Sequence, residues 1–72
     1  MSLGKNLQYL RRLSKDMTQE TLAEKLNVSR QTISKWETAK GLPDISLLQP
    51  LAQALGISVI ELMNGEPIIN QN

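Results

Sequence analysis

The sequence predicts a small all-α domain. Its 72 residues make one domain, near the lower size at which a core without disulfides or metals can hold a fold. With one Trp, one Tyr and no Phe, the core must be built from Leu, Ile, Val and Ala, a mixture that favours packed helices over sheet. Apolar residues also recur at intervals of three and four along most of the chain, which is the spacing of amphipathic helices.

Apolar spacing predicts a first helix from about Leu3 to Lys15, and a break follows it. Thr18 is a favourable N-cap for a second, short helix, because its side chain can accept from a free amide of the first turn. The apolar face of this second helix is made by Leu22, Ala23 and Leu26. Asn27 then tolerates the left-handed backbone with which helices commonly end, so we expect the chain to turn there.

The third helix is expected from Ser29 to about Thr38. Ser29 is a good N-cap, and Ile33 and Trp36 form the ridge that faces the core. Two short helices joined by a tight turn form a helix-turn-helix, an arrangement that places its second helix in the DNA major groove.

A connector at 40–43 leads to a fourth helix that begins at Asp44 and ends at Gly56. Its apolar positions are Ile45, Leu48, Leu51, Ala52 and Leu55. Pro50 lies within this stretch, where it is expected to bend or delay the helix. Ser58 and Glu61 match a capping box that starts a fifth helix. We expect a folded domain over residues 1–65 and a flexible tail over 66–72.

Composition argues against most enzymes. The chain has no Cys and no His, which removes disulfides, thiolate nucleophiles, most zinc chemistry and the usual general base. It has no phosphate-binding loop and no nucleophile with a base, so we expect no enzymatic activity, no cofactor, no metal and no small-molecule substrate. It also has no apolar run of membrane-spanning length and no signal region, which indicates a cytoplasmic protein with no membrane partner.

The net charge of +1 hides an asymmetry between the two parts of the chain. Residues 1–40 carry eight basic and four acidic side chains, for a net charge of +4, whereas residues 41–72 carry three acidic side chains and no basic one, for −3. Ordinary solvated charge would explain so small a bias, but a basic half beside an acidic half also suits a polyanionic partner.

The polar face of the third helix carries groups suited to base edges. At about 100° per residue, its polar side chains fan across the side opposite Ile33. We expect base contacts from Arg30, Gln31, Ser34 and Lys35. We expect phosphate contacts from Gln19, Ser29, Thr32, Thr38 and Lys40. Gln19 lies at the start of the second helix, where free amides and the helix dipole favour a phosphate.

Three stretches resemble the phage Cro and repressor helix-turn-helix family, also called the XRE family: TQETLAEKLNVSRQTISKWE, GLPDISLLQPLAQALGIS and ELMNG. The resemblance covers about residues 4–65. It implies a five-helix, repressor-like bundle whose helices 2 and 3 form the helix-turn-helix. It also implies a sequence-specific transcriptional regulator, most simply a repressor, that reads operator DNA with its third helix.

The sequence departs from the family pattern at three places. Asn27 replaces the usual turn glycine, and Ala39 replaces a glycine common after the third helix. The segment before Gln19 is also one residue longer, which leaves Arg11 and Arg12 as alternative partners for Glu37 in the family's buried ion pair. Arg11 shares the face of core residue Leu7, four positions earlier, and is therefore favoured.

The end of the chain carries apolar residues that a small core cannot all bury. Val59 and Ile60 are adjacent and do not easily both face inward, and Ile68 and Ile69 add further apolar area. These residues predict a homodimer bound to a double-stranded operator. The alternative is a protein-interaction module, such as an antitoxin or the DNA-binding domain of a larger regulator, in which the same apolar residues bind a protein partner.

Overall fold

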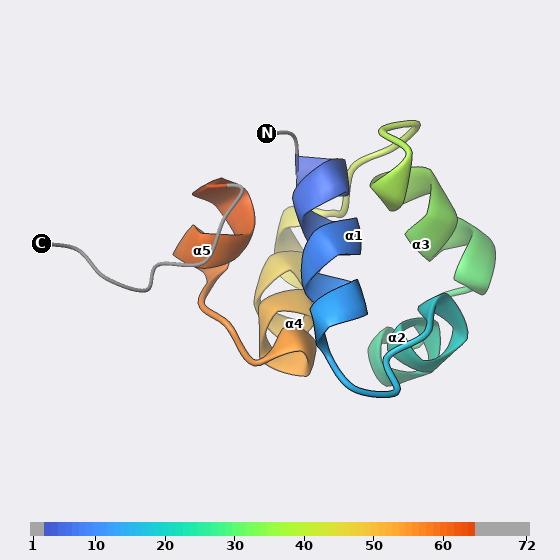
Figure 1. The fold of residues 1–72 in the computed structure, drawn as a ribbon. Coiled ribbons are helices and arrows are strands. Elements are labelled where there is room, and N and C mark those ends of the chain that lie inside the picture. The colour runs from blue at the N-terminus through green and yellow to red at the C-terminus, as the bar shows by residue number, and fades with distance from the viewer. Residues whose placement is uncertain (1–2, 65–72) are drawn as a thin grey trace, which may run out of the picture.

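The computed structural model describes residues 3–64, which form five helices and no strand (Figure 1). The helices are α1 (Leu3–Leu13), α2 (Gln19–Leu26), α3 (Arg30–Glu37), α4 (Ile45–Leu55) and α5 (Val59–Asn64). The predicted all-α fold is confirmed. The predicted tail at 66–72, with Ile68 and Ile69, lies outside the described residues. None of the described helices is long and apolar enough to cross a membrane.

Each helix contributes one fully buried aliphatic side chain to a single core. These are Leu7, Leu22, Ile33, Leu51 and Leu62. Trp36 is also buried, in accordance with its predicted role as a core anchor. The core therefore consists of the aliphatic residues that the composition requires, and it closes without a disulfide because the chain has no cysteine.

Two details of α4 differ from the prediction. The spacing predicts Ile45 on the apolar face, but Ile45 is 82% exposed, because it lies in the first turn of α4 and the buried residues of this helix begin only at Leu51. Pro50 lies inside α4 yet does not delay it, since the helix begins directly after Asp44. Because proline has no N–H, α4 lacks only the backbone hydrogen bond that residue 50 would donate to the Ser46 carbonyl. The Pro50 side chain is exposed to solvent.

The contacts between helices place α3 and α5 on different sides of α1 (Figure 1). α3 packs against α1 and α2, while α5 packs against α1 and α4. α2 and α4 also pack together and close the bundle. In Figure 1, α3 accordingly lies on one side of α1 and α5 on the other, so the outer face of α3 is left uncovered.

Three helices end with the same backbone motif. A left-handed residue follows each helix: Asn27 (φ 60°), Ala39 (φ 62°) and Gly56 (φ 75°). The next amide then bonds to a carbonyl five positions back, as in the 2.8 Å bond from Lys40 N–H to the Lys35 carbonyl. The predicted turn at Asn27 is confirmed. α1 ends two residues earlier than predicted, and the turn after it contains a left-handed Asp16 (φ 59°).

The helix starts follow the predicted capping residues. The hydroxyl of Thr18 accepts a hydrogen bond from Thr21 N–H, and Asp44 accepts one from Ser46 N–H. At α5 the capping box is complete: Glu61 N–H donates to Ser58 Oγ at 3.0 Å, and Ser58 N–H donates to Glu61 Oε1 at 2.9 Å. These interactions are local, which is why the sequence was sufficient to predict them.

Asn6 joins α1 to α5 in a way that the sequence did not indicate. Its side chain is fully buried, and Nδ2 donates to the carbonyl oxygens of Glu61 at 3.1 Å and Leu62 at 2.7 Å. Both carbonyls belong to the last turn of α5, where helices lack internal partners. Asn6 therefore caps α5 from another helix, and this holds α5 against α1.

Candidate nucleic-acid interface

α2, the turn and α3 follow one another in the chain, and the two helices pack together. Only Asn27, Val28 and Ser29 separate the two helices. Ser29 Oγ accepts a hydrogen bond from Thr32 N–H at 3.1 Å and lies 2.9 Å from Thr32 Oγ1. The backbone at both ends of the turn is thus fixed, by the left-handed Asn27 and by the capped start of α3.

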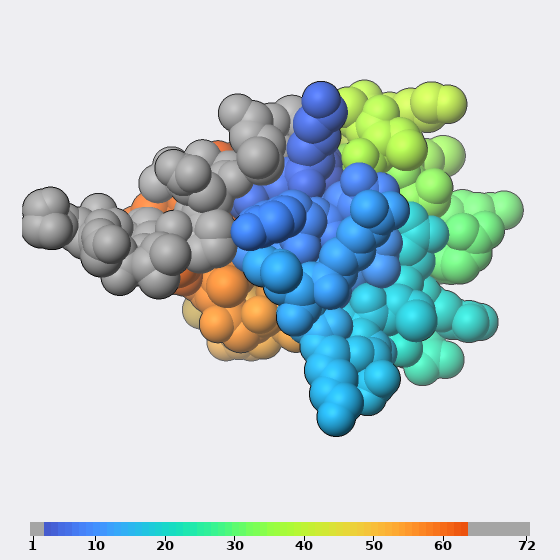
Figure 2. Space-filling view, in the orientation of Figure 1, coloured from blue at the N-terminus to red at the C-terminus, as the bar shows by residue number. Residues whose placement is uncertain are grey.

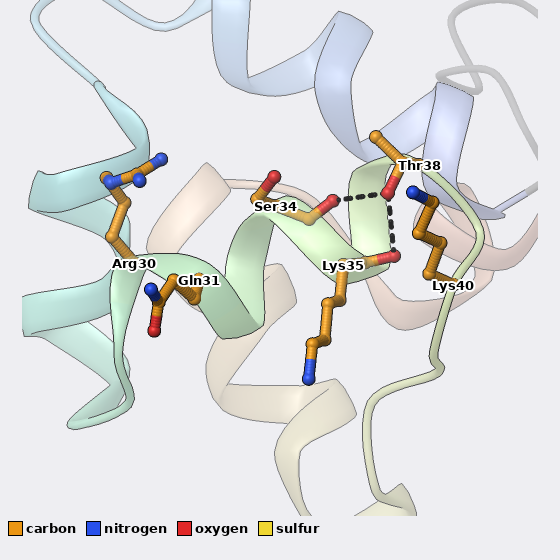
Figure 3. Close-up of a pocket in the computed structure, with 6 residues that line it drawn as sticks. All are labelled: Arg30, Gln31, Ser34, Lys35, Thr38 and Lys40. Carbon is orange, nitrogen blue, oxygen red and sulfur yellow. Dashed lines mark hydrogen bonds between the residues drawn. The ribbon is translucent and has the colours of Figure 1, made fainter.

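The outer face of α3 and the loop after it form an open hollow (Figure 3). Its lining residues are Arg30, Gln31, Ser34, Lys35, Thr38 and Lys40. The hollow is thus lined by three cations and three neutral polar residues, with no carboxylate. All four predicted base-contacting residues and two of the predicted phosphate-contacting residues meet there. In the space-filling view, side chains of α3 and the following loop protrude at the edge away from α5 (Figure 2).

Hydrogen bonds at the end of α3 hold the loop that carries Lys40. Thr38 Oγ1 donates to the Ser34 carbonyl at 2.8 Å, and Lys40 N–H donates to the Lys35 carbonyl. The hydroxyl hydrogen of Thr38 is therefore already used within the helix, whereas Lys40 is exposed and lines the hollow. Lys40 is the better placed of these two residues to meet an anion.

A buried ion pair braces the inner side of α3. Arg11 Nε donates to Glu37 Oε2 at 2.6 Å, and Arg11 Nη2 donates to Oε1 at 3.1 Å. The Arg11 side chain is 12% exposed and that of Glu37 is 0% exposed. Arg11 also donates to the Met17 carbonyl, whereas Arg12 faces solvent. Of the two arginines that the sequence left open, Arg11 is the partner of Glu37.

The Gln19 side chain bridges α2 and α3 through two hydrogen bonds. Its Nε2 donates to Glu37 Oε1 at 2.9 Å, and its Oε1 accepts from Arg30 Nη1 at 3.1 Å. Gln19 does not line the hollow, and neither do Ser29 and Thr32, whose side chains belong to the α3 cap. Sequence reasoning missed the link from Glu37 through Gln19 to Arg30, because no local pattern marks it.

Within residues 3–64, no three acidic, histidine or cysteine side chains are grouped to hold a metal ion. The chemistry available on the outer face of α3 is therefore that of cationic and amide hydrogen-bond donors and hydroxyl groups.

Comparisons with known proteins agree with this arrangement. The chain is similar to an HTH-type transcriptional activator, BcrR, of Enterococcus faecalis, with 44% identity over 96% of this chain and 33% of the relative. It is also similar to the immunity repressor protein of Bacillus phage phi105, with 35% identity over 99% of this chain and 49% of the relative. The chain thus spans a third of one relative and about half of the other.

A solved structure has the same fold. The P22 c2 repressor, solved in complex with a synthetic operator, matches with a TM-score of 0.83 and 27% sequence identity over 92% of this chain and 98% of that one. The model of a helix-turn-helix family matches residues 7–62, which contain the α2–turn–α3 unit and the Arg11–Glu37 pair that braces it. The chain therefore belongs to the helix-turn-helix family, among domains of the phage Cro and repressor type.

Proposed function

We propose that this domain is a sequence-specific DNA-binding transcriptional regulator that reads operator DNA in the major groove with α3. The observation that carries the proposal is the hollow on the outer face of α3, with its three cations and no carboxylate. Double-stranded DNA is a polyanion whose major groove admits a helix and presents acceptors for Arg and Lys. A helix of eight residues with this outer face matches that surface in size and in charge.

The polar residues of α3 divide into two proposed roles. Arg30, Gln31, Ser34 and Lys35 contact base edges, since Arg and Lys donate to guanine and Gln pairs with adenine. Lys40 contacts phosphate, with Gln19, Ser29, Thr32 and Thr38 in supporting positions. Because Ser29 and Thr32 share one hydrogen bond between their hydroxyls, one hydroxyl hydrogen of the pair remains free to donate to phosphate.

Repression is the proposed mode of action. The phi105 and P22 relatives are named repressors, and the E. faecalis relative is named an activator. Occupying an operator is sufficient to block transcription, whereas activation needs a further contact with the transcription machinery. A reporter gene placed behind the selected operator tests this, since its expression should fall when the protein is supplied.

A two-fold homodimer is the proposed state on DNA. Ile60 is 63% exposed and Met63 is 50% exposed, and their spacing of three places them on one side of α5. Val59 is half-buried, so the adjacent pair divides between core and surface as expected. A dimer formed through α5 would present two copies of α3 to half-sites about one helical turn apart.

The same exposed residues favour the second candidate, a protein-interaction module. The two functions separate in a salt titration with random duplex DNA. A DNA-binding domain loses affinity linearly with the logarithm of the salt concentration, because each phosphate contact releases counterions. An interaction module would bind random duplex weakly at every salt concentration.

The main test is to select bound duplexes from a random pool and then compare variants on the selected and random DNA. Gln31→Ala should cost about 1 to 3 kcal/mol on the selected duplex, relax the choice at one base pair and leave random affinity nearly unchanged. Lys40→Ala should weaken all duplexes alike and reduce the salt slope by about one. Exposed residues outside the hollow provide matched controls, Gln53→Ala for the amide and Lys15→Ala for the cation. Equal losses of Gln31→Ala on both kinds of DNA would contradict its role in base reading, and selection of no duplex would overturn the proposed function.

A further inference from the structure

We infer that Thr38 is a positioning residue for the phosphate contact of Lys40. Its hydroxyl group closes the last turn of α3 and thereby holds the loop that carries Lys40. The inference rests on the proposed function and specifies how Thr38, one of the supporting residues, acts: it acts through Lys40 rather than by touching phosphate itself.

Thr38 and Lys40 donate hydrogen bonds to the same backbone carbonyl. Thr38 Oγ1 donates to the Ser34 carbonyl at 2.8 Å and, over a longer distance of 3.4 Å, to the Lys35 carbonyl (Figure 3). The Lys40 N–H donates to that Lys35 carbonyl at 2.8 Å. The Thr38 hydroxyl and the backbone of the loop therefore meet at one oxygen atom in the last turn of α3.

The residue between them is held in a backbone conformation that it does not favour. Ala39 has φ 62°, and left-handed backbone is unfavourable for a residue with a Cβ atom. Its own N–H donates to the Trp36 carbonyl over 3.3 Å, a longer bond than the one from Lys40. The direction in which the chain leaves α3 thus depends on the hydrogen bonds made by the two neighbours of Ala39.

The same hydroxyl group lowers the repulsion that a phosphate meets at this end of α3. The carbonyl end of a helix carries partial negative charge, which disfavours a nearby anion. The hydroxyl hydrogen of Thr38 lies on two of these carbonyls, and Lys40 supplies a cation just beyond them. Because that one hydrogen is engaged, the Thr38 oxygen otherwise offers only lone pairs, which cannot bond to a phosphate oxygen. Thr38 is thus arranged to assist Lys40 and not to bind phosphate.

Thr38→Val tests this role, because it keeps the shape of the side chain and removes the donor. Thr38 is exposed, so the variant should fold. Affinity would be measured for the selected duplex and for random duplex over a range of salt. We expect both to be bound roughly threefold more weakly, the effect of one neutral hydrogen bond, with a salt slope lower by less than about one. Ser14→Ala is the matched control and should change neither quantity, since Ser14 Oγ donates to the Leu10 carbonyl at 3.2 Å outside the hollow.

The Lys40→Ala background shows whether the effect passes through Lys40. There, Thr38→Val should cause no further weakening and no further change of slope, because the group that Thr38 positions is absent. An equal loss in both backgrounds with an unchanged slope would assign Thr38 its own contact with DNA, since a neutral hydroxyl releases no counterion, and would overturn the inference. Thr38→Ser keeps the hydroxyl and should bind like wild type. A Thr38→Ser variant as weak as Thr38→Val would also overturn the inference, because the loss would then come from the methyl group.

Hydrogen exchange of the Lys40 amide tests the positioning without DNA. This amide should exchange faster in Thr38→Val than in wild type, while the amides of α1 exchange at unchanged rates. Unchanged exchange at Lys40, or unchanged affinity and slope in Thr38→Val, would overturn the inference. If wild-type protein bound random duplex with no dependence on salt, the proposed function itself would fail. That outcome is seen in wild type alone and is distinct from salt-dependent wild-type binding that Thr38→Val leaves unchanged.

Discussion

Gly4 lies directly against the backbone carbonyl of Trp36. A Cβ atom added at Gly4 would be 2.3 Å from the Trp36 carbonyl oxygen and 3.1 Å from that of Glu37. The first turn of α1 therefore meets the last turn of α3 at a distance that only glycine permits. This contact and the Arg11–Glu37 pair, one near the start of α1 and one near its end, orient α3 on the rest of the domain.

Gly4→Ala should lower the free energy of unfolding by about 2 kcal/mol. Overpacking costs about 1 to 3 kcal/mol, and the cost here lies near the upper end because contact with a backbone atom cannot be relieved by rotating a side chain. The preference of a helix for alanine over glycine, about 1 kcal/mol, offsets part of that cost. Urea unfolding followed by circular dichroism measures the difference. Gly41→Ala is the control, because its nearest neighbour would be the Lys35 Cβ at 3.9 Å. A Gly4→Ala variant as stable as wild type would show that the two helices can move apart at no cost.

Removing one partner of the buried ion pair should be costly. Arg11→Ala leaves the carboxylate of Glu37 buried and without its cation, so we expect a loss on the order of 3 kcal/mol. Arg12→Ala removes an exposed side chain and should change stability by less than about 0.5 kcal/mol. Thermal melts of the two variants give the comparison. The reverse ranking would mean that the register of α1 is different.

Ala39→Gly should stabilise the protein. A residue with a Cβ atom lowers stability by about 1 to 2 kcal/mol in left-handed backbone, and glycine removes this cost. The greater freedom of glycine in the unfolded chain cancels about 0.5 to 1 kcal/mol of that gain. We therefore expect a gain of about 0.5 to 1 kcal/mol in denaturant unfolding.

Two matched variants check that reasoning. Gly56→Ala should lose about what Ala39→Gly gains, since Gly56 has φ 75° and open space around its Cβ position. Asn27→Gly should change little, because Asn tolerates left-handed backbone. A destabilised Ala39→Gly variant would show that the Ala39 methyl makes a packing contact of greater value than the strain it carries.

Asn6→Ala should weaken the attachment of α5. It removes the donor for two carbonyls of the last turn, a loss of about 1 to 3 kcal/mol. Asn6→Asp tests whether residue 6 acts as the hydrogen-bond donor. At neutral pH the Asp carboxylate would face two carbonyl oxygens, so this variant should be less stable than Asn6→Ala. Hydrogen exchange of the α5 amides, measured for both variants, would report the loss locally. An Asn6→Asp variant as stable as wild type at neutral pH would contradict the assigned role.

Asp44 should contribute stability that disappears in acid. Hydrogen bonds from the Ser46 hydroxyl and from the Ser46 backbone N–H lower the pKa of the Asp44 carboxyl below 3.8. A group whose pKa is lower in the folded state stabilises the protein above its unfolded pKa, and this stability is lost as the pH falls through the folded pKa. The Tm difference between wild type and Asp44→Asn should therefore shrink below about pH 4. A difference that stayed constant to the lowest pH at which both proteins fold would contradict the shift.

The sequence alone determined the number, order and type of the helices. Thr18, Ser29 and Asn27 act on backbone groups within a few residues of themselves, so their capping and turning roles can be read without a fold. The helical spacing of apolar residues likewise identified the core. It failed at Ile45, because periodicity does not say where the first turn of a helix meets the edge of that core.

Only the tertiary structure decided the contacts between helices that brace α3 and α5. The Arg11–Glu37 pair joins residues 26 apart, the Gln19–Glu37 bond joins residues 18 apart, and Asn6 reaches a carbonyl 56 residues away. No local spacing specifies which side chains meet across such separations, so the sequence left the partner of Glu37 open, did not indicate the Gln19–Glu37 bond and gave Asn6 no role. Packing of α1 against α3 and α5, and of α2 against α3, creates those neighbours. The Glu37 carboxylate, which only accepts hydrogen bonds, then receives the NH2 group of the Gln19 amide.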